Sequence, residues 1–144
     1  PLTVLTSMFL HGGVAHLAVN LLTLWIFGNA VEGAIGRLRF TGLYLLSGVV
    51  AALAQALAAA VTGDVLVPMV GASGAIAGVL AAFLVLFPRA RILHAPAALL
   101  IGVWFAVQVL AIVFGGDPGV AFGAHVGGFV AGYLLVRTWR AARA

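Results

Sequence analysis

Long apolar runs follow one another along the chain, and short breaks containing Gly, Pro, Asp or Arg separate them. Each run approaches the roughly 20 residues that a helix needs to cross a bilayer, and only a helix or a closed barrel satisfies its own backbone in lipid. The pattern predicts five transmembrane helices, at about residues 10–31, 40–61, 70–87, 92–114 and 120–136. Because no repeat or linker interrupts them, we expect a single all-α, polytopic membrane bundle over residues 1–144.

The composition supports this fold class. Hydrophobic residues make up 65% of the chain and charged residues 7%, whereas soluble domains are about half apolar and a quarter charged. The net charge of +4 gives no support for nucleic-acid binding, because positive residues beside apolar runs are the ordinary orientation signal of membrane proteins. The abundance of Ala and Arg without Lys is typical of a high-GC bacterial genome, so we expect a bacterial inner-membrane protein.

The arginines predict the orientation, because short loops rich in basic residues stay in the cytoplasm. They follow the first, third and fifth runs, whereas Asp64 and Asp117 follow the second and fourth. The basic residues are Arg37, Arg39, Arg89, Arg91, Arg137, Arg140 and Arg143. We therefore expect these loops and the C-terminus to be cytoplasmic and Pro1 to lie outside. A chain that begins outside without Met is expected to be a fragment, and an upstream span would complete a six-helix protein.

The residue inventory excludes several chemistries. Without Cys there is no thiol nucleophile, disulfide or thiolate metal site, and without Lys there is no Ser-Lys dyad. Neither Glu32 nor the two aspartates lies mid-span, so an intramembrane aspartyl pair is excluded. Any base must then be a histidine. We expect no metal and no cofactor.

Polar residues lie near the predicted outer ends of the first, third and fifth spans, where one shallow pocket can hold them. They are His11, His16, Asn20, Ser73 and His125. His16 and Asn20 are four residues apart and share a helix face, whereas His11 and His16 are poorly placed for a metal pair. Such groups either hydrogen-bond between helices as packing residues or donate to a developing negative charge as an oxyanion hole.

Small residues surround Ser73 and His125. Ser73 lies between Gly71 and Gly74, shortly after Pro68, which predicts a helix start where free N–H groups favour an oxyanion. Stripes of small residues at four-residue spacing let helix backbones approach closely. One stripe is Gly74 and Gly78, and the other is Ala124, Gly128 and Gly132. We therefore favour nucleophile and base over simple packing roles for Ser73 and His125.

These motifs together resemble the rhomboid intramembrane serine proteases. The family's H-x4-H-x3-N, G-x-S-G and A-H-x-x-G patterns match His11, His16 and Asn20, then Gly71, Ser73 and Gly74, then Ala124, His125 and Gly128. The stretch from Trp25 to Gly36 is also similar, and the resemblance covers about Thr6 to Arg137. The chain departs from common family residues in two places: the pair Leu2-Thr3 replaces Trp-Arg, and Ala77 replaces a Tyr that stacks on the base.

The resemblance implies a Ser73–His125 dyad, with His16, Asn20 and the Ser73 backbone N–H as the oxyanion hole. It implies structural roles near the site for His11, Gly71, Gly74 and Glu32, and a lid at Phe114 to Gly119. The implied partners are transmembrane protein substrates, cut near the outer face of the lipid bilayer.

Two other functions stay open from the sequence. A non-catalytic rhomboid-like protein would bind or distort transmembrane helices, but such proteins usually lack the Ser or the His. A transporter or channel would need a polar path beyond Thr23, Ser47 and Gln55. Trp104, Gln108 and His94 are expected to have packing or interfacial roles.

Overall fold

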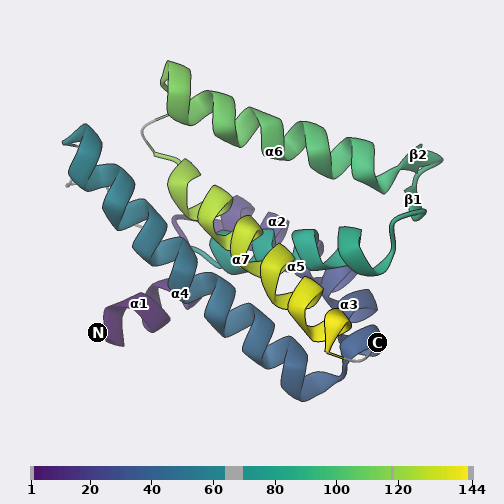
Figure 1. Ribbon diagram of the computed structural model, residues 1–144. Coiled ribbons are helices and arrows are strands. Elements are labelled where there is room, and N and C mark those ends of the chain that lie inside the picture. Colours follow the sequence, from purple (N-terminus) through teal and green to yellow (C-terminus); the bar gives the residue numbers. More distant parts are fainter. Residues whose placement is uncertain (1, 64–69, 118, 143–144) are drawn as a thin grey trace.

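The computed structural model describes residues 2–63, 70–117 and 119–142, and these residues form a bundle of helices (Figure 1). The elements in chain order are α1 (Leu2–Thr6), η1 (Ser7–Phe9), α2 (Val14–Thr23), η2 (Leu24–Gly28), α3 (Asn29–Ile35), α4 (Arg37–Thr62), α5 (Ser73–Leu86), β1 (Arg91–Ile92), β2 (Ala95–Pro96), α6 (Ala97–Phe114) and α7 (Phe122–Ala141). The predicted helical membrane bundle is confirmed. Pro1, Asp64, Pro68, Pro118 and Arg143, which entered the sequence predictions, lie outside the described residues.

The first long helix runs from Val14 to Ile35 and contains one widened turn, the π-helical segment η2. It ends at Gly36, whose φ of 84° lies in the left-handed region that favours glycine. The chain then reverses into α4. Gly36 therefore separates the first two apolar helices, where the sequence pattern predicts the break.

Helix α5 lies at the centre of the bundle. Every residue from Gly74 to Phe83 is buried, and α4, α7 and the helix formed by α2, η2 and α3 pack around them. Val79 of α5 packs with Val31 and Leu43 in this core. A helix that is apolar all round is stable only when it is covered on every side, so α5 suits this position. Its first residue, Ser73, is held at a fixed place by the surrounding helices.

The most extensive helix contact joins α5 to α7, and small residues form it. A Cβ atom added at Gly128 would lie 2.8 Å from the carbonyl carbon of Gly74, and one at Gly132 would lie 2.6 Å from the carbonyl carbon of Gly78. Real Cβ atoms essentially never come within 3.0 Å of another atom, so these positions exclude any larger residue. The predicted close approach of the two glycine stripes is confirmed.

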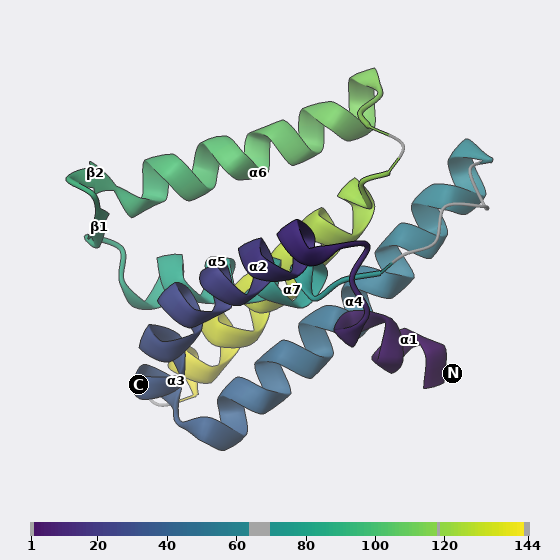
Figure 2. The same cartoon turned by 180° about the vertical axis from the view of Figure 1, so that it is seen from behind.

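Helix α6 stands apart from the centre and packs mainly along α7, as Figures 1 and 2 show from opposite sides. It begins at Ala97 rather than near Ile92, because β1 and β2 form a short antiparallel hairpin before it. The hairpin turn is made by Leu93 and His94, whose φ angles are 46° and 70°. The fourth helix therefore begins about five residues later than the sequence pattern predicts.

Within the part of the chain that the structure describes, three helices are long and apolar enough to cross a membrane: Val14–Ile35, Arg37–Thr62 and Ala97–Phe114. Helix α5 has 14 residues and is shorter than an ordinary span. Large apolar side chains are exposed on the outer surfaces, as expected for a face in contact with lipid. The number of spans stays a prediction.

Candidate active site

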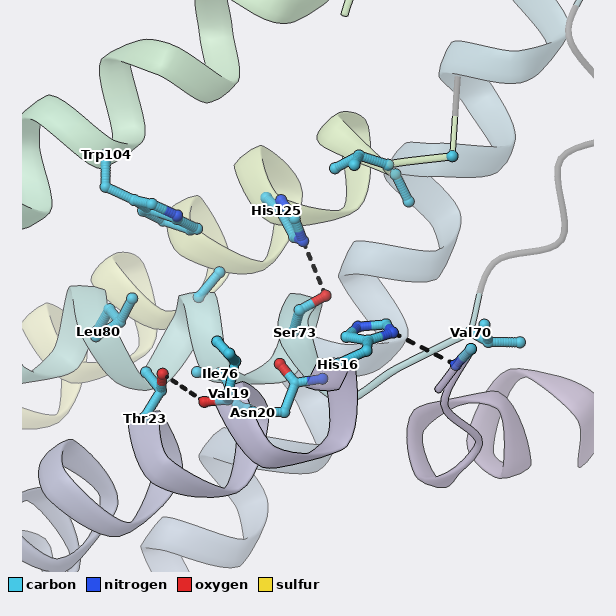
Figure 3. Close-up of a pocket in the computed structure, with 15 residues that line it drawn as sticks. His16, Val19, Asn20, Thr23, Val70, Ser73, Ile76, Leu80, Trp104 and His125 are labelled. Carbon is cyan, nitrogen blue, oxygen red and sulfur yellow. Dashed lines mark hydrogen bonds between the residues drawn. The ribbon is translucent and has the colours of Figure 1, made fainter. Parts of the chain in front are cut away.

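Ser73 and His125 come together although they are 52 residues apart in the chain. Ser73 is the first residue of α5, and His125 lies in the first turn of α7. The Ser73 Oγ and His125 Nε2 atoms are 2.8 Å apart and form a hydrogen bond (Figure 3). The close packing of α5 on α7 makes this contact possible, because a serine side chain is too short to cross an ordinary helix separation.

The pair borders a cavity of about 420 Å³. Ends or faces of α2, α5, α6 and α7 surround the cavity, and both polar and apolar side chains line it. The lining residues are Gly12, His16, Val19, Asn20, Thr23, Val70, Ser73, Ile76, Ala77, Leu80, Trp104, Gly119, Val120, Ala121 and His125. A cavity of this size accommodates a short extended peptide segment and water.

His16 and Asn20 lie on the face of α2 that borders the same cavity (Figure 3). Asn20 is 6% exposed, and its Nδ2 has no hydrogen-bond partner among the described residues. A buried donor without an acceptor is costly, typically by about 1–3 kcal/mol, so its persistence at a cavity wall needs a reason. An oxygen atom of a molecule bound between Asn20 and Ser73 would supply this acceptor.

Gly71 packs directly against the His16 ring, where a residue with a side chain does not fit. A Cβ atom at this position would lie 2.8 Å from Cε1 and 2.9 Å from Nε2 of His16. The φ of Gly71 is 120°, and its N–H donates to the Ser7 carbonyl at 2.9 Å. Both the space and the backbone therefore require glycine here, beside the first turn of α5.

The other predicted residues lie around the cavity or away from it. The His11 ring packs edge-on against His16, with 5.2 Å between ring centroids, but His11 does not line the cavity. Gly74 packs against Ala51 and Ala124.

Glu32 was expected near the site, yet it lies at the far end of its helix and pairs with Arg37 at 3.3 Å. Its position corrects that expectation, because about 16 residues of helix separate it from His16.

Two residues of α6 that the sequence predictions assigned to packing touch the candidate base. The Gln108 Oε1 atom lies 2.7 Å from His125 Nδ1, and the Trp104 ring lies 5.7 Å from the His125 ring between centroids. The residue at position 77, where the resemblance leads us to expect a Tyr stacked on the base, is a small alanine. In this chain Trp104 contacts the imidazole. A single glutamine inside an apolar membrane helix indicates a functional role, because a polar side chain there is costly. The sequence alone could therefore have identified Gln108 as a candidate.

The segment after α6 borders the cavity. Gly115, with a φ of 83°, ends α6, and Asp117 accepts a hydrogen bond from the Gly119 N–H at 2.7 Å. Gly119 and Val120 then line the same cavity as His125. Of the described part of the expected lid, only Gly119 lines the cavity, so the lid stays a prediction.

The arrangement suits acyl transfer. A serine hydroxyl is hydrogen-bonded to an imidazole, and side-chain donors border the same space, which is the geometry of nucleophile, base and oxyanion hole. Over residues 2–63, 70–117 and 119–142, no three His, Asp or Glu side chains cluster closely enough to hold a metal ion.

Comparison with known proteins gives one consistent result. The family model described as "Rhomboid domain" matches residues 1–141. The chain is similar to Rhomboid protein 1, mitochondrial, of Saccharomyces cerevisiae, with 34% identity over 92% of this chain and 40% of that protein. It is also similar to RHOMBOID-like protein 4 of Arabidopsis thaliana, with 34% identity over 91% of this chain and 32% of that protein.

A bacterial relative is similar over a shorter stretch. Rhomboid protease GluP of Bacillus subtilis is 44% identical over 56% of this chain and 15% of that protein. The chain spans two fifths or less of the length of these three relatives. No solved structure matches it.

Proposed function

The chain belongs to the rhomboid family, and from this premise we propose that it is a serine endopeptidase that cleaves transmembrane segments of membrane proteins. One observation carries the proposal: Ser73 Oγ and His125 Nε2 lie 2.8 Å apart at the wall of a cavity that Asn20 also lines, and the buried Asn20 Nδ2 atom has no hydrogen-bond partner among the described residues. Similarity to a relative named as a rhomboid protease supports it.

In the proposed reaction, His125 Nε2 takes the proton of the Ser73 hydroxyl while Oγ attacks the carbonyl carbon of the scissile peptide bond. The carbonyl oxygen becomes an oxyanion, and donors from His16, Asn20 and the Ser73 backbone N–H stabilise it. Collapse of the intermediate breaks the C–N bond, and His125 gives its proton to the leaving amine. A water molecule, deprotonated by His125, then attacks the acyl ester and releases the second product together with free Ser73.

The site lies near helix starts, which determines how a substrate reaches it. Ser73 and His125 are both in the first turn of their helices, so we infer that the cavity opens toward the membrane surface at which α5 and α7 begin. A helical substrate hides its carbonyl groups in its own hydrogen bonds and must unwind before attack. We infer a preference for transmembrane segments with weak helices near that surface.

The orientation is part of the proposal. The arginines at the start of α4 and the end of α7 lie at the end of the bundle opposite the cavity, where Arg140 Nη1 donates to the Val85 carbonyl at 2.7 Å. Since short basic loops stay in the cytoplasm, we place the cavity on the extracytoplasmic side of a bacterial cell membrane.

The test is cleavage of a fluorescently tagged transmembrane segment by purified protein in liposomes. We expect cleavage by the wild type and none by Ser73→Ala. Ser7→Ala is the matched control, because the Ser7 hydroxyl bonds only to the Val4 carbonyl among the described residues, and it should cleave normally. If Ser73→Ala still cleaves, the proposed nucleophile is wrong. Binding of the segment without cleavage by the wild type would favour the non-catalytic alternative.

A further inference from the structure

Gln108 is a buried polar residue on a helix that is otherwise apolar throughout. It is 6% exposed, and the rest of α6 from Ala97 to Phe114 consists of apolar side chains and one glycine. Burial of an amide in a membrane helix is costly unless the amide is hydrogen-bonded. Gln108 meets this requirement by reaching across to His125 on α7. A hydrogen-bonded chain thus runs from Gln108 through His125 to Ser73, and so from α6 through α7 to α5.

The contacts of the Gln108 amide determine which of its atoms faces the imidazole. Its Nε2 donates to the Trp104 carbonyl, one turn earlier on α6, at 3.2 Å. A carbonyl oxygen accepts hydrogen bonds and cannot donate, so the amide nitrogen belongs on that side. The Oε1 atom then faces His125 Nδ1, which lies 2.7 Å away.

The Gln108 Oε1 atom can only accept, so His125 Nδ1 must carry the hydrogen of the neutral ring. The other ring nitrogen, Nε2, is then left with its lone pair, and it faces Ser73 Oγ. This is the tautomer that accepts a proton from serine. The opposite tautomer would place a hydrogen on Nε2 and leave the Nδ1 lone pair facing the Gln108 oxygen, which is a repulsive contact.

We infer that Gln108 is a positioning residue that holds His125 in the tautomer and ring orientation a general base needs, and that α6 therefore completes the site. The inference rests on the proposed protease function. Trp104, four residues before Gln108 on the same face of α6, packs its ring against the same imidazole. Because α6 packs mainly along α7, His125 is oriented only while these two helices stay packed together beside Gln108.

The expected effect follows from the nature of the bond. Gln108 is neutral and orients the ring without supplying a charge, so its loss should cost about tenfold, as for an ordinary hydrogen bond. Gln108→Leu keeps the volume and removes the acceptor, and we expect kcat to fall by about tenfold with KM unchanged. Gln108→Glu keeps an acceptor oxygen and should retain most of the wild-type rate.

The experiment combines cleavage kinetics with ¹⁵N spectra of histidine-labelled protein in lipid, in which the His125 signals are identified by their loss in His125→Ala. We expect the hydrogen on Nδ1 in the wild type and a larger share on Nε2 in Gln108→Leu. Gln55→Leu is the matched control: Gln55 also bonds to α7, through the Ala124 N–H at 3.3 Å, but it does not touch the imidazole. This control should leave the tautomer and kcat unchanged.

Each failure has its own signature. A wild type with the hydrogen on Nε2, or a Gln108→Leu variant with the wild-type tautomer and kcat, overturns the positioning role. An equal loss in Gln108→Leu and Gln55→Leu also overturns it, because it indicates general damage to helix packing. Absence of any Ser73-dependent cleavage in the wild type contradicts the proposed function instead, and the tautomer is still read separately from the spectra.

Discussion

Replacing Gly128 with Ala puts a methyl group into the contact between α5 and α7, and this contact holds the nucleophile beside its base. The new Cβ would lie 2.8 Å from the Gly74 carbonyl carbon, whereas ordinary van der Waals contact begins at 3.4 Å. The Cβ would also overlap the Gly74 carbonyl oxygen, and both groups belong to helix backbones, so no side chain can rotate away and the helices must separate by more than about 0.6 Å. Such overpacking costs about 1–3 kcal/mol of folding free energy.

The same separation acts on the site. The distance from Ser73 Oγ to His125 Nε2 would grow from 2.8 Å to about 3.4 Å or more, beyond a normal O–H···N hydrogen bond. Displacements of this order cost about ten- to a hundredfold in rate. We therefore expect Gly128→Ala to cleave a tagged transmembrane segment at least about tenfold more slowly than the wild type, and to unfold at a lower temperature.

The matched control is Gly42→Ala on α4, where an added Cβ meets no atom within 4 Å. Alanine is the better helix former by up to about 1 kcal/mol, so this variant should be as stable as the wild type or more stable. Cleavage and thermal unfolding are measured on both variants in the same lipid. If Gly128→Ala matches Gly42→Ala in rate and stability, the helix contact does not control the site, and this account of it is wrong.

Three further substitutions test separate parts of the structure. Asn20→Ala removes an amide donor that has no partner within the described ranges and should lower kcat by about a hundred- to a thousandfold while the protein stays folded; an unchanged kcat would remove Asn20 from the oxyanion hole. Gly71→Ala places a Cβ 2.8 Å from the His16 ring at a φ of 120°, so both thermal stability and cleavage should fall, and a fully active variant would contradict the close packing. Ser47→Ala removes a buried hydroxyl without a partner among the described residues, so thermal unfolding should stay the same or move upward; a large destabilisation would show that the hydroxyl has a partner.

The sequence predicted the parts of the fold that depend on local chemistry. Apolar runs and breaking residues locate the helices, because lipid admits few other backbone structures. The small residues of the two stripes predict the α5–α7 contact, because only glycine allows backbones to come that close. From this contact it follows that Ser73 and His125 meet.

Features that depend on which side of an apolar helix faces the protein could not be predicted. Helix α6 is apolar except at Gln108, so its pattern marks one inward-facing residue but does not identify the residue on α7 that Gln108 meets. The pairing of Gln108 with His125 needed the structure for this reason. The hairpin before α6 was missed because Leu93 continues the apolar run, although it is 93% exposed with a positive φ.

The most direct test of the central claim is covalent labelling by a fluorophosphonate, which reacts with a serine whose hydroxyl is activated by a base. The wild-type protein in lipid is labelled, and the modified peptide is identified by mass spectrometry. We predict that the label is on Ser73, is absent in Ser73→Ala and is strongly reduced in His125→Ala. A wild type without label on Ser73, or a His125→Ala variant labelled as fast as the wild type, would contradict the claim that His125 activates Ser73.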